Sequence, residues 1–287
     1  MPSPVGDVET ANNLKKYFSG YDTWQSFFSF VCCLDCDLLY TQTYPDEVDL
    51  QDLYSTVAHN EVGQDGPALD ATHTWLAKQF VAEGLRHRGG RPRTLEIGPD
   101  TGRFASAFVE QVEVSAIDFV EPNLSVWADL RRRFGDESTV VGSISEVNPS
   151  IKYDVIVAHH VFDHIPDLQG LMKSINSLAS NGATLSVVVH NHRSLLRRAM
   201  RSKWPPFCLQ HPQLFSRRAL AKLLEQNGWS VRVVRRQINF VGLRATLNNL
   251  VGVLGGRRRS VPRRDVVVPI RFGNIGVIAD RVDPGVA

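Results

Sequence analysis

The sequence predicts an α/β fold with a mainly parallel sheet. From residue 68 to residue 280, short apolar runs of strand character alternate with longer segments of helical spacing. Several runs also end on acidic or histidine side chains. Because the carboxyl ends of parallel strands share one edge of a sheet, where ligands bind, these side chains predict a ligand site along that edge. The side chains expected there are Glu96, Glu121, His159, His160 and His190.

The first strand, over 94–97, ends in a glycine turn. Gly98 and Gly102 supply backbone freedom where a ligand must come close. A helix predicted over 103–111 follows, and its free N–H groups open toward the turn. This arrangement is typical of a site for a nucleotide-like ligand.

The other elements follow from the same patterns. A helix over 68–88 ends at Gly89-Gly90, and Ser216 suits the N-cap of a helix that ends before Gly228. A helix marked by Leu168 to Leu178 is expected to stop at Asn181-Gly182. The strands that we expect after the first cover 114–121, 139–142, 153–159, 183–189, 231–234 and 275–280.

The spacing of the glycines distinguishes two classes of nucleotide site. A dinucleotide fold uses G-x-G-x-x-G, whereas Gly98 and Gly102 stand four apart and Ala105 occupies the third glycine position. The pattern E-x-G-x-(G)-x-G resembles motif I of the class I S-adenosylmethionine-dependent methyltransferases. Asp100 replaces the middle glycine, and aspartate adopts left-handed conformations more readily than most residues. A nicotinamide-dependent oxidoreductase, and a member of the fold without turnover, stay open as alternatives.

The second strand extends this resemblance. It ends on Glu121-Pro122, which is similar to the Glu-Pro-Ser of the family, and Glu121 lies 25 positions after Glu96. An acidic side chain here can accept hydrogen bonds from both ribose hydroxyls. Asp118 is the rival for this role, and we prefer Glu121.

Two later segments add to it. Residues 153–167 resemble the FDvIv…LEHipD segment of small-molecule methyltransferases, with Phe162-Asp163-His164 in place of Leu-Glu-His. The third strand ends on Gly-Ser-Ile where relatives carry Gly-Asp, so the hydroxyl of Ser143 would replace the usual acceptor of the adenine amine.

The resemblance implies a Rossmann-like, seven-stranded, mostly parallel sheet with helices on both faces and an antiparallel last strand. It also implies S-adenosylmethionine as cofactor and S-adenosylhomocysteine as product. Glu96 would meet the α-amino end of the cofactor, Gly98 and Gly102 its methionine and ribose, and Glu121 the ribose. The full set of expected cofactor-binding residues is Glu96, Gly98, Pro99, Asp100, Gly102, Glu121, Pro122, Ser143 and His159.

Residues 1–67 lack the α/β alternation, and we predict a small aromatic cap ahead of a methyltransferase domain over 68–287. Part of the cap resembles the opening of methyltransferases that begin with a zinc ribbon, but only Cys33 and Cys36 form a knuckle. Zinc needs four ligands, so it would require distant partners such as His59. We therefore expect a metal-free remnant. The aromatic side chains of the cap are Tyr17, Phe18, Tyr21, Trp24, Phe27, Phe28 and Phe30.

Residues 190–215 resemble an insertion that forms part of the acceptor pocket in relatives, and we predict an acceptor-side lid there. Its arginines offer contact with an acidic acceptor or a membrane surface, with a solvated helix face as the alternative. A hydroxyl acceptor needs a general base, for which His211 and His160 are the leading candidates. We expect His164 to fix its loop, and we expect no metal site at His190 and His192.

Composition limits the acceptor and the compartment. With 32 basic and 30 acidic side chains, the net charge of +2 argues against a nucleic-acid binder. The Asp/Asn-Pro-Pro-Tyr/Phe run that grips a flipped base is replaced by Ala158 to Phe162. We expect a small-molecule acceptor, methylated on oxygen rather than nitrogen or carbon, such as a sugar, a glycolipid or a natural product. No leader and no apolar run of about 18 residues is evident, so we expect a cytoplasmic protein.

Overall fold

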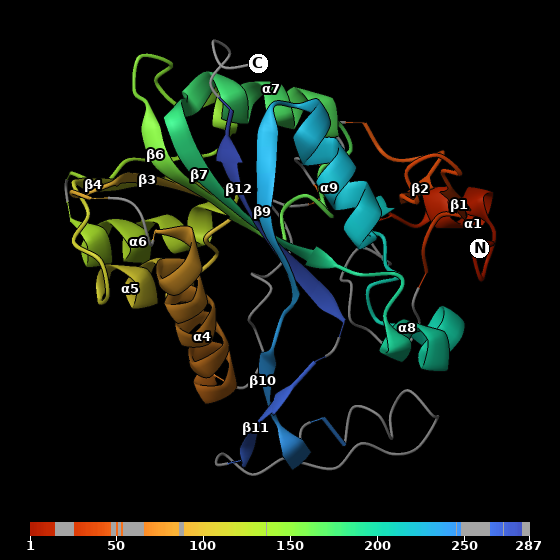
Figure 1. Ribbon diagram of the computed structural model, residues 1–287. Coiled ribbons are helices and arrows are strands. Elements are labelled where there is room, and N and C mark those ends of the chain that lie inside the picture. Colours follow the sequence, from red (N-terminus) through yellow and green to blue (C-terminus); the bar gives the residue numbers. More distant parts are fainter. Residues whose placement is uncertain are drawn as a thin grey trace.

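The centre of the protein is a seven-stranded sheet (Figure 1). The computed structural model describes residues 1–14, 26–46, 50, 53, 66–85, 89–135, 137–244, 246–247, 265–271 and 273–282. In spatial order the strands are β5 (Val140–Val141), β4 (Ala116–Val120), β3 (Arg93–Ile97), β6 (Tyr153–His159), β7 (Ala179–His190), β12 (Asn274–Arg281) and β9 (Trp229–Arg236). β12 pairs antiparallel with both β7 and β9, and the pairs from β5 to β7 are parallel. The predicted fold class is confirmed.

Helices cover both faces of this sheet (Figure 1). One face carries α4 (Gly66–Gly84), α5 (Arg103–Val109) and α6 (Trp127–Phe134), the last preceded by η1 (Leu124–Val126). The other carries α7 (Leu168–Leu178) and α9 (Arg217–Gln226). Ser216 caps α9 as predicted, because its side chain accepts the N–H of Ala219.

The middle strand β6 shows why the sheet needs both layers. Val155 and Val157 pack with α4 and α5, whereas Ile156 and Ala158 pack with α7 and α9. All four side chains are buried. Successive side chains of a strand point to opposite faces, so a continuous apolar run requires cover on each side.

The start of β7 differs from the expectation. The helix α7 ends at Leu178 as predicted, but β7 begins at once at Ala179, which pairs with Tyr153. Asn181 and Gly182 therefore lie within the strand instead of in a connecting turn. The pairing shifts register between Tyr153 and Val155, and Gly182 has φ 64°. A local bulge thus absorbs the turn residues without ending the strand.

A ribbon of two strands was not predicted. β10 (Asn239–Gly242) pairs antiparallel with β11 (Val267–Ile270), and their partners are far apart in sequence. The hydroxyl of Thr72 on α4 accepts the N–H of Phe240 at 2.8 Å and donates to the Phe240 carbonyl at 3.3 Å. The ribbon is therefore attached to α4 beyond the end of β9. The basic run at 257–264 lies outside the described residues.

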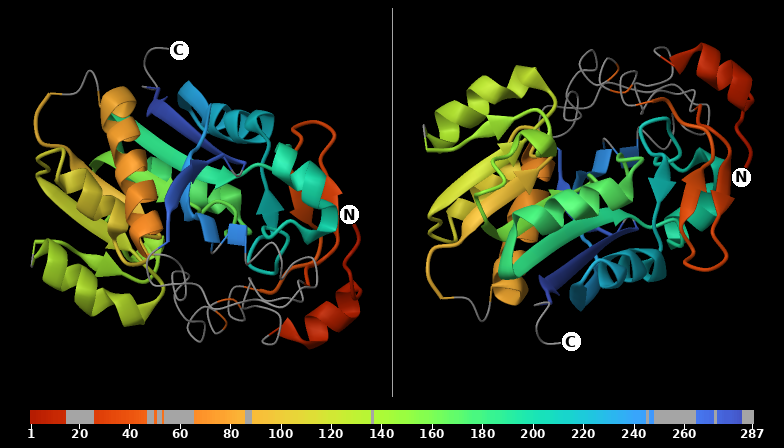
Figure 2. Two further views of the ribbon diagram at one scale, coloured as in Figure 1. Left: turned by 90° about the horizontal axis from the view of Figure 1, so that it is seen from below. Right: turned by 90° about the horizontal axis from the view of Figure 1, so that it is seen from above.

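The N-terminal segment and the predicted lid form one structure. After α1 (Asp7–Asn12), β1 (Phe30–Cys32) pairs with β2 (Leu39–Thr41), and β2 pairs with β8 (Gln213–Leu214) of the lid. Figure 2 shows these strands beside the teal lid segment, which also carries α8 (Leu195–Met200) and η3 (Arg201–Lys203). A short η2 (Ile144–Glu146) follows β5.

An aromatic core lies beneath this small sheet. Phe27 and Phe30 of the N-terminal segment pack against Trp204 and Phe207 of the lid. The ring centroids of Phe30 and Phe207 are 5.4 Å apart. These aromatic residues of the cap therefore pack onto the lid. Tyr17, Phe18, Tyr21 and Trp24 lie outside the described residues.

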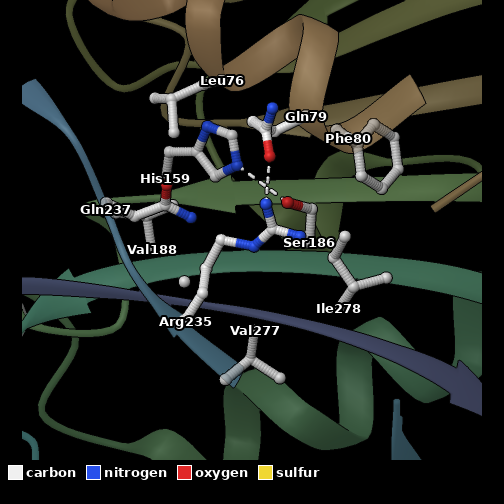
Figure 3. Close-up of a pocket in the computed structure, with 11 residues that line it drawn as sticks. Leu76, Gln79, Phe80, His159, Ser186, Val188, Arg235, Gln237, Val277 and Ile278 are labelled. Atoms are coloured by element: carbon white, nitrogen blue, oxygen red, sulfur yellow. Dashed lines mark hydrogen bonds between the residues drawn. The ribbon is translucent and has the colours of Figure 1, made fainter. Parts of the chain in front are cut away.

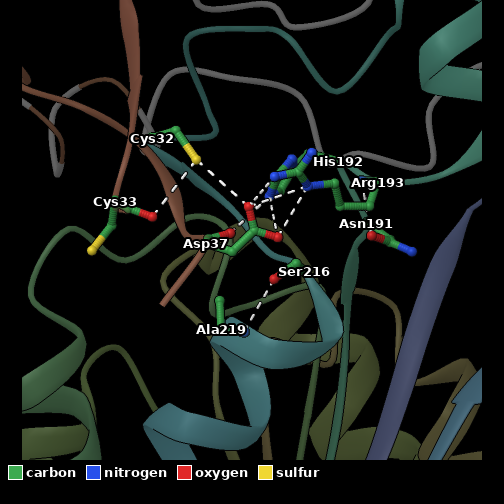
Figure 4. A network of polar contacts seen from close by, with 8 residues as sticks. All are labelled: Cys32, Cys33, Asp37, Asn191, His192, Arg193, Ser216 and Ala219. Carbon is green, nitrogen blue, oxygen red and sulfur yellow. Dashed lines mark hydrogen bonds and ion pairs between the residues drawn. The ribbon is translucent and has the colours of Figure 1, made fainter. Parts of the chain in front are cut away.

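Polar contacts join the same two parts (Figure 4). Asp37, in a left-handed conformation with φ 66°, forms an ion pair with Arg193, and its carbonyl accepts the ring N–H of His192 at 2.8 Å. The guanidinium of Arg193 holds the pKa of Asp37 at about 2. Lys222 of α9 pairs with Asp35 of the same turn. One lid arginine is thus committed to the N-terminal segment instead of facing an acceptor.

The joint core of cap and lid can be tested by removing one ring. Phe30→Ala should lower the free energy of unfolding by about 3 to 5 kcal/mol, because a fully buried aromatic side chain is lost. Leu34→Ala on the adjoining turn is the control. Its side chain is 96% exposed, so the change should stay within about 0.5 kcal/mol. Urea denaturation measures both, and equal stabilities of the two variants would contradict a shared core.

Candidate functional site

The glycine turn after β3 has three left-handed residues at alternate positions. Gly98, Asp100 and Gly102 have φ values of 67°, 48° and 73°. A Cβ atom on Gly98 would lie 2.8 Å from Cγ2 of Val161, and one on Gly102 would lie 2.7 Å from Cδ2 of Leu130. Conformation and space both require glycine at these two positions. Asp100 takes the conformation that the missing middle glycine would have.

Two buried carboxylates flank this turn. Glu96 on β3 is 3% exposed and Glu121, directly after β4, is 6% exposed. Oε2 of Glu121 accepts the N–H of Asp100 at 3.0 Å, and Oε1 accepts the N–H of Asn123 at 2.8 Å. Oε2 of Glu96 is buried without a hydrogen-bond partner. The strand ends and the turn therefore enclose one acidic cradle.

Burial governs the protonation of this pair. It raises the pKa of Glu96 to about 8, and repulsion from Glu121 adds to the shift. Burial likewise raises the pKa of Glu121 to about 7, although the N–H groups of Asn123 and Asp100 oppose it. A positively charged ligand would keep both carboxylates ionised at neutral pH.

Asp118, the rival to Glu121, is engaged inside the sheet. Its carboxylate accepts hydrogen bonds from Arg93 at 2.8 Å, from the hydroxyl of Tyr153 at 2.9 Å and from the N–H of Thr139 at 2.8 Å. These contacts link β3, β4 and β6 below the ligand edge. The geometry places Glu121, and not Asp118, against the turn.

The remaining expected cofactor contacts lie along the same edge. Pro99 is buried in the turn, whereas Pro122 is exposed beside Glu121. Ser143 follows β5 and caps η2, with its hydroxyl 2.9 Å from that of Ser145. The exposed side chain of Leu124, at 69%, adds an apolar surface after Pro122 that the sequence did not single out.

His159 faces a different pocket from the other histidines. Its Nε2 lies 2.9 Å from the hydroxyl of Ser186. Its ring packs edge to face with that of Phe104, with the two ring centroids 4.6 Å apart. Figure 3 shows it pointing into a small pocket between α4 and the sheet, near Gln79 and Arg235. Phe104, whose ring packs on that of His159, lies two residues after Gly102 at the start of α5.

A cluster of histidines around one carboxylate lies at the ends of β6 and β7. Nδ1 of His190 is 2.5 Å from Oδ2 of Asp163, which also accepts the His190 backbone N–H at 2.9 Å. His160 adopts φ 55°, and its ring centroid lies 4.7 Å from that of His190. The ring centroid of His211 in the lid lies 4.8 Å from that of His190, and the ring centroid of His164 lies 4.5 Å from that of His211. The two expected base candidates thus belong to one cluster.

Burial keeps these imidazoles neutral. It lowers the pKa of His160 to about 3 and those of His190 and His211 to about 4. It raises the pKa of Asp163 to about 6, so the carboxylate is mostly ionised at neutral pH. Neutral imidazoles can accept a proton or bind a metal ion.

Sequence reasoning did not give Asp163 a role. The sequence marked this residue only as the acidic member of Phe162-Asp163-His164. Its partner His190 is 27 residues away, so the contact cannot be seen in the local pattern. His192 lies apart from the cluster, at the carbonyl of Asp37.

Cys33 and Cys36 lie in the turn between β1 and β2. Among the described residues, no group of three or more potential metal ligands includes them. His59, the distant partner considered above, lies outside the described residues. In the same described part of the chain, none of the helices is both long and apolar enough to cross a bilayer.

Comparison with known proteins agrees with this geometry. The model of the family described as "Methyltransferase domain" matches residues 70–234. The 1,6-didemethyltoxoflavin-N1-methyltransferase of Burkholderia thailandensis, solved with bound 1,6-didemethyltoxoflavin and S-adenosylhomocysteine, is 16% identical with a TM-score of 0.55. That similarity covers 88% of this chain and 98% of the Burkholderia chain. No curated protein sequence matches this chain.

Two further solved structures share the fold. Magnesium protoporphyrin IX methyltransferase from Synechocystis PCC 6803, with bound S-adenosylhomocysteine, is 14% identical with a TM-score of 0.53, covering 82% of this chain and 100% of that one. The N-methyltransferase NodS from Bradyrhizobium japonicum WM9, in complex with S-adenosylhomocysteine, is 10% identical with a TM-score of 0.51, covering 82% and 98%.

The residues of this chain fit the cofactor of these proteins. The unpartnered Oε2 of Glu96 and the paired carboxylate of Glu121 suit a cationic ligand with ribose hydroxyls. At Gly98 a side chain would collide with Val161, so the backbone itself forms this wall of the cradle. The family match spans more than half of the chain, which rules out the nicotinamide alternative. The chain therefore belongs to the class I S-adenosylmethionine-dependent methyltransferases, and S-adenosylmethionine is its cofactor.

Proposed function

We propose that this methyltransferase modifies a hydroxyl group of a small molecule, such as a sugar, a glycolipid or a natural product. The observation that carries the proposal is the cluster of neutral histidines beside the glycine turn. Val161 reaches Gly98, and His160 is its neighbour in the chain. A hydroxyl must lose its proton on methylation, and neutral imidazoles next to a carboxylate suit that task.

The cofactor contacts follow from the strand ends. Glu121 accepts hydrogen bonds from the ribose hydroxyls, since its carboxylate has lone pairs beyond those that accept the N–H groups of Asp100 and Asn123. Glu96 receives the α-amino group, directly or through water. Bound in this cradle, S-adenosylmethionine supplies the methyl group on a positively charged sulfur. The proposed lining is completed by the backbone of Gly98, Asp100 and Gly102 and by Pro99, Pro122, Ser143 and His159.

Within the histidine cluster, exposure separates the two base candidates. The side chain of His160 is 34% exposed, and its Nδ1 has no hydrogen-bond partner. His211 is 2% exposed, and its Nδ1 lies 2.8 Å from the carbonyl of Pro206. We infer that His160 faces the acceptor and that His211 supports the ring of His190 from behind.

The proposed domain organisation keeps residues 68–287 as the methyltransferase domain with a lid at 190–215, preceded by the cap. The pairing of β2 with β8 supports an acceptor wall to which cap and lid both contribute. Trp204, whose ring lies 6.2 Å from that of His190, belongs to this wall.

The acceptor class can be tested with matched compounds. We expect S-adenosylhomocysteine to form with hydroxylated sugars, glycolipids or polyketides, and not with analogues that carry an amine at the same position. Mass spectrometry of both products measures this. Methylation of the amines alone would replace the hydroxyl proposal, and cofactor binding without product from either panel would favour a member of the fold without turnover.

The ribose role of Glu121 can be tested by calorimetry. Glu121→Ala should weaken S-adenosylhomocysteine binding by about 1 to 3 kcal/mol, because its hydrogen bonds to the ligand are lost. Glu113→Ala is the control, because Glu113 precedes β4 whereas Glu121 follows it. Its side chain is 69% exposed and its removal should leave the affinity unchanged. Equal affinities in both variants would remove Glu121 from the site.

The raised pKa values predict the pH dependence of binding. Glu121 and Glu96 ionise at about 7 and about 8 in the free protein, and the ligand favours their ionised forms. Affinity for S-adenosylhomocysteine should therefore rise from pH 6 to pH 8, by about tenfold if one proton is displaced. Glu121→Gln should flatten this rise, because only Glu96 then titrates. A slope that is the same in wild type and variant would contradict the assignment.

A further inference from the structure

Three side chains of the histidine cluster converge as metal ligands do. One potential ligand atom each from His160, Asp163 and His190 lies within 4.8 Å of the other two. In the described part of the chain, this is the one group of three or more such residues. Nδ1 of His190 lies 2.5 Å from Oδ2 of Asp163, and Nδ1 of His160 lies 4.0 Å from the same oxygen.

The cluster holds two buried polar atoms without partners. Oδ1 of Asp163 and Nδ1 of His160 make no hydrogen bond within the protein, and the Asp163 side chain is fully buried. Proteins seldom leave buried polar atoms unpaired, and such atoms call for an unseen water or ion. A buried carboxylate oxygen and a buried ring nitrogen without partners are donor atoms that suit a cation.

We propose that His160, Asp163 and His190 bind one divalent transition-metal ion of the zinc or cobalt type. Ligand atoms around such an ion lie roughly 3.0 to 3.4 Å apart when each metal bond is about 2.1 Å long. The two distances to Oδ2 of Asp163 bracket this value. The site is completed by small side-chain rotations that move Nδ1 of His160 closer to Oδ2 of Asp163 and Nδ1 of His190 farther from it. Two imidazoles favour zinc, cobalt or nickel over magnesium.

The surroundings suit a site with an open position. The side chain of His160 is 34% exposed, that of His190 is 13% exposed and that of Asp163 is inaccessible, so the ion would be reached from the side of His160. Three protein ligands leave room for the oxygen of an acceptor.

The role of the ion deepens the proposed function and rests on it. An acceptor hydroxyl in the open position would lose its proton to water at neutral pH, as metal-bound water does. Its oxygen then forms a bond to the methyl carbon while the bond from that carbon to the positively charged sulfur breaks, leaving a neutral thioether. His160 would thus act on the acceptor as a ligand of the ion, and the hydroxyl proton would go to water instead of to its ring.

Metal binding can be measured without any acceptor. The full chain, stripped with a chelator, should take up one equivalent of Co²⁺ with visible absorption bands, and Zn²⁺ should displace it. Asp163→Asn and His190→Ala should each weaken uptake at least about tenfold. His192→Ala, and the double variant Cys33→Ser with Cys36→Ser, should bind as wild type does. Circular dichroism establishes that each variant is folded.

Each result decides the proposal. Absent Co²⁺ uptake in the wild-type chain, full uptake by Asp163→Asn, or uptake lost in the cysteine variant would overturn the site. Undiminished methylation of a hydroxyl acceptor by the stripped protein would overturn its role and leave the proposed function standing. Metal uptake at this site together with methylation of amines alone would keep the site and overturn the hydroxyl proposal.

Discussion

Two carboxyl groups buried side by side constrain the cofactor end of this protein. Parallel pairing of β3 with β4 brings Glu96 and Glu121 to adjacent strand ends, where water is excluded. Glu121 is held by the N–H groups of Asp100 and Asn123, so the turn is shaped around a carboxylate. Glu96 has no such support on Oε2. Burial and mutual repulsion disfavour ionisation of both groups, so a positively charged ligand would stabilise the doubly ionised pair.

The sheet could be predicted because each strand is marked by residues next to one another in the sequence. Each central strand is a short apolar run bounded by turn residues, and buried parallel strands need no partner-specific signal. The ribbon of β10 and β11 could not be predicted, since its strands are separated by more than twenty residues and are held by Thr72 of α4. The start of β7 was missed because pairing with Tyr153 overrode the turn preference of Asn181-Gly182.

In the candidate site, too, some residues could be predicted from local sequence and others could not. Glu96 and Glu121 were identified from their positions at strand ends, and the structure brings both to the glycine turn. The histidine cluster is a tertiary feature. Asp163 became relevant only through its contact with His190, and the preference for His160 over His211 depends on burial, which sequence spacing does not reveal. The lid arginine Arg193 likewise found its partner, Asp37, more than 150 residues away.

The strand pairing between β2 and β8 has a mechanical consequence. Residues 39–41 and 213–214 share backbone hydrogen bonds and an aromatic core, so the two segments are tied together. His211 sits two residues before β8, and its ring packs on that of His190. A displacement of residues 211–214 would therefore disturb both the pairing with the N-terminal strands and the packing of His211 on His190.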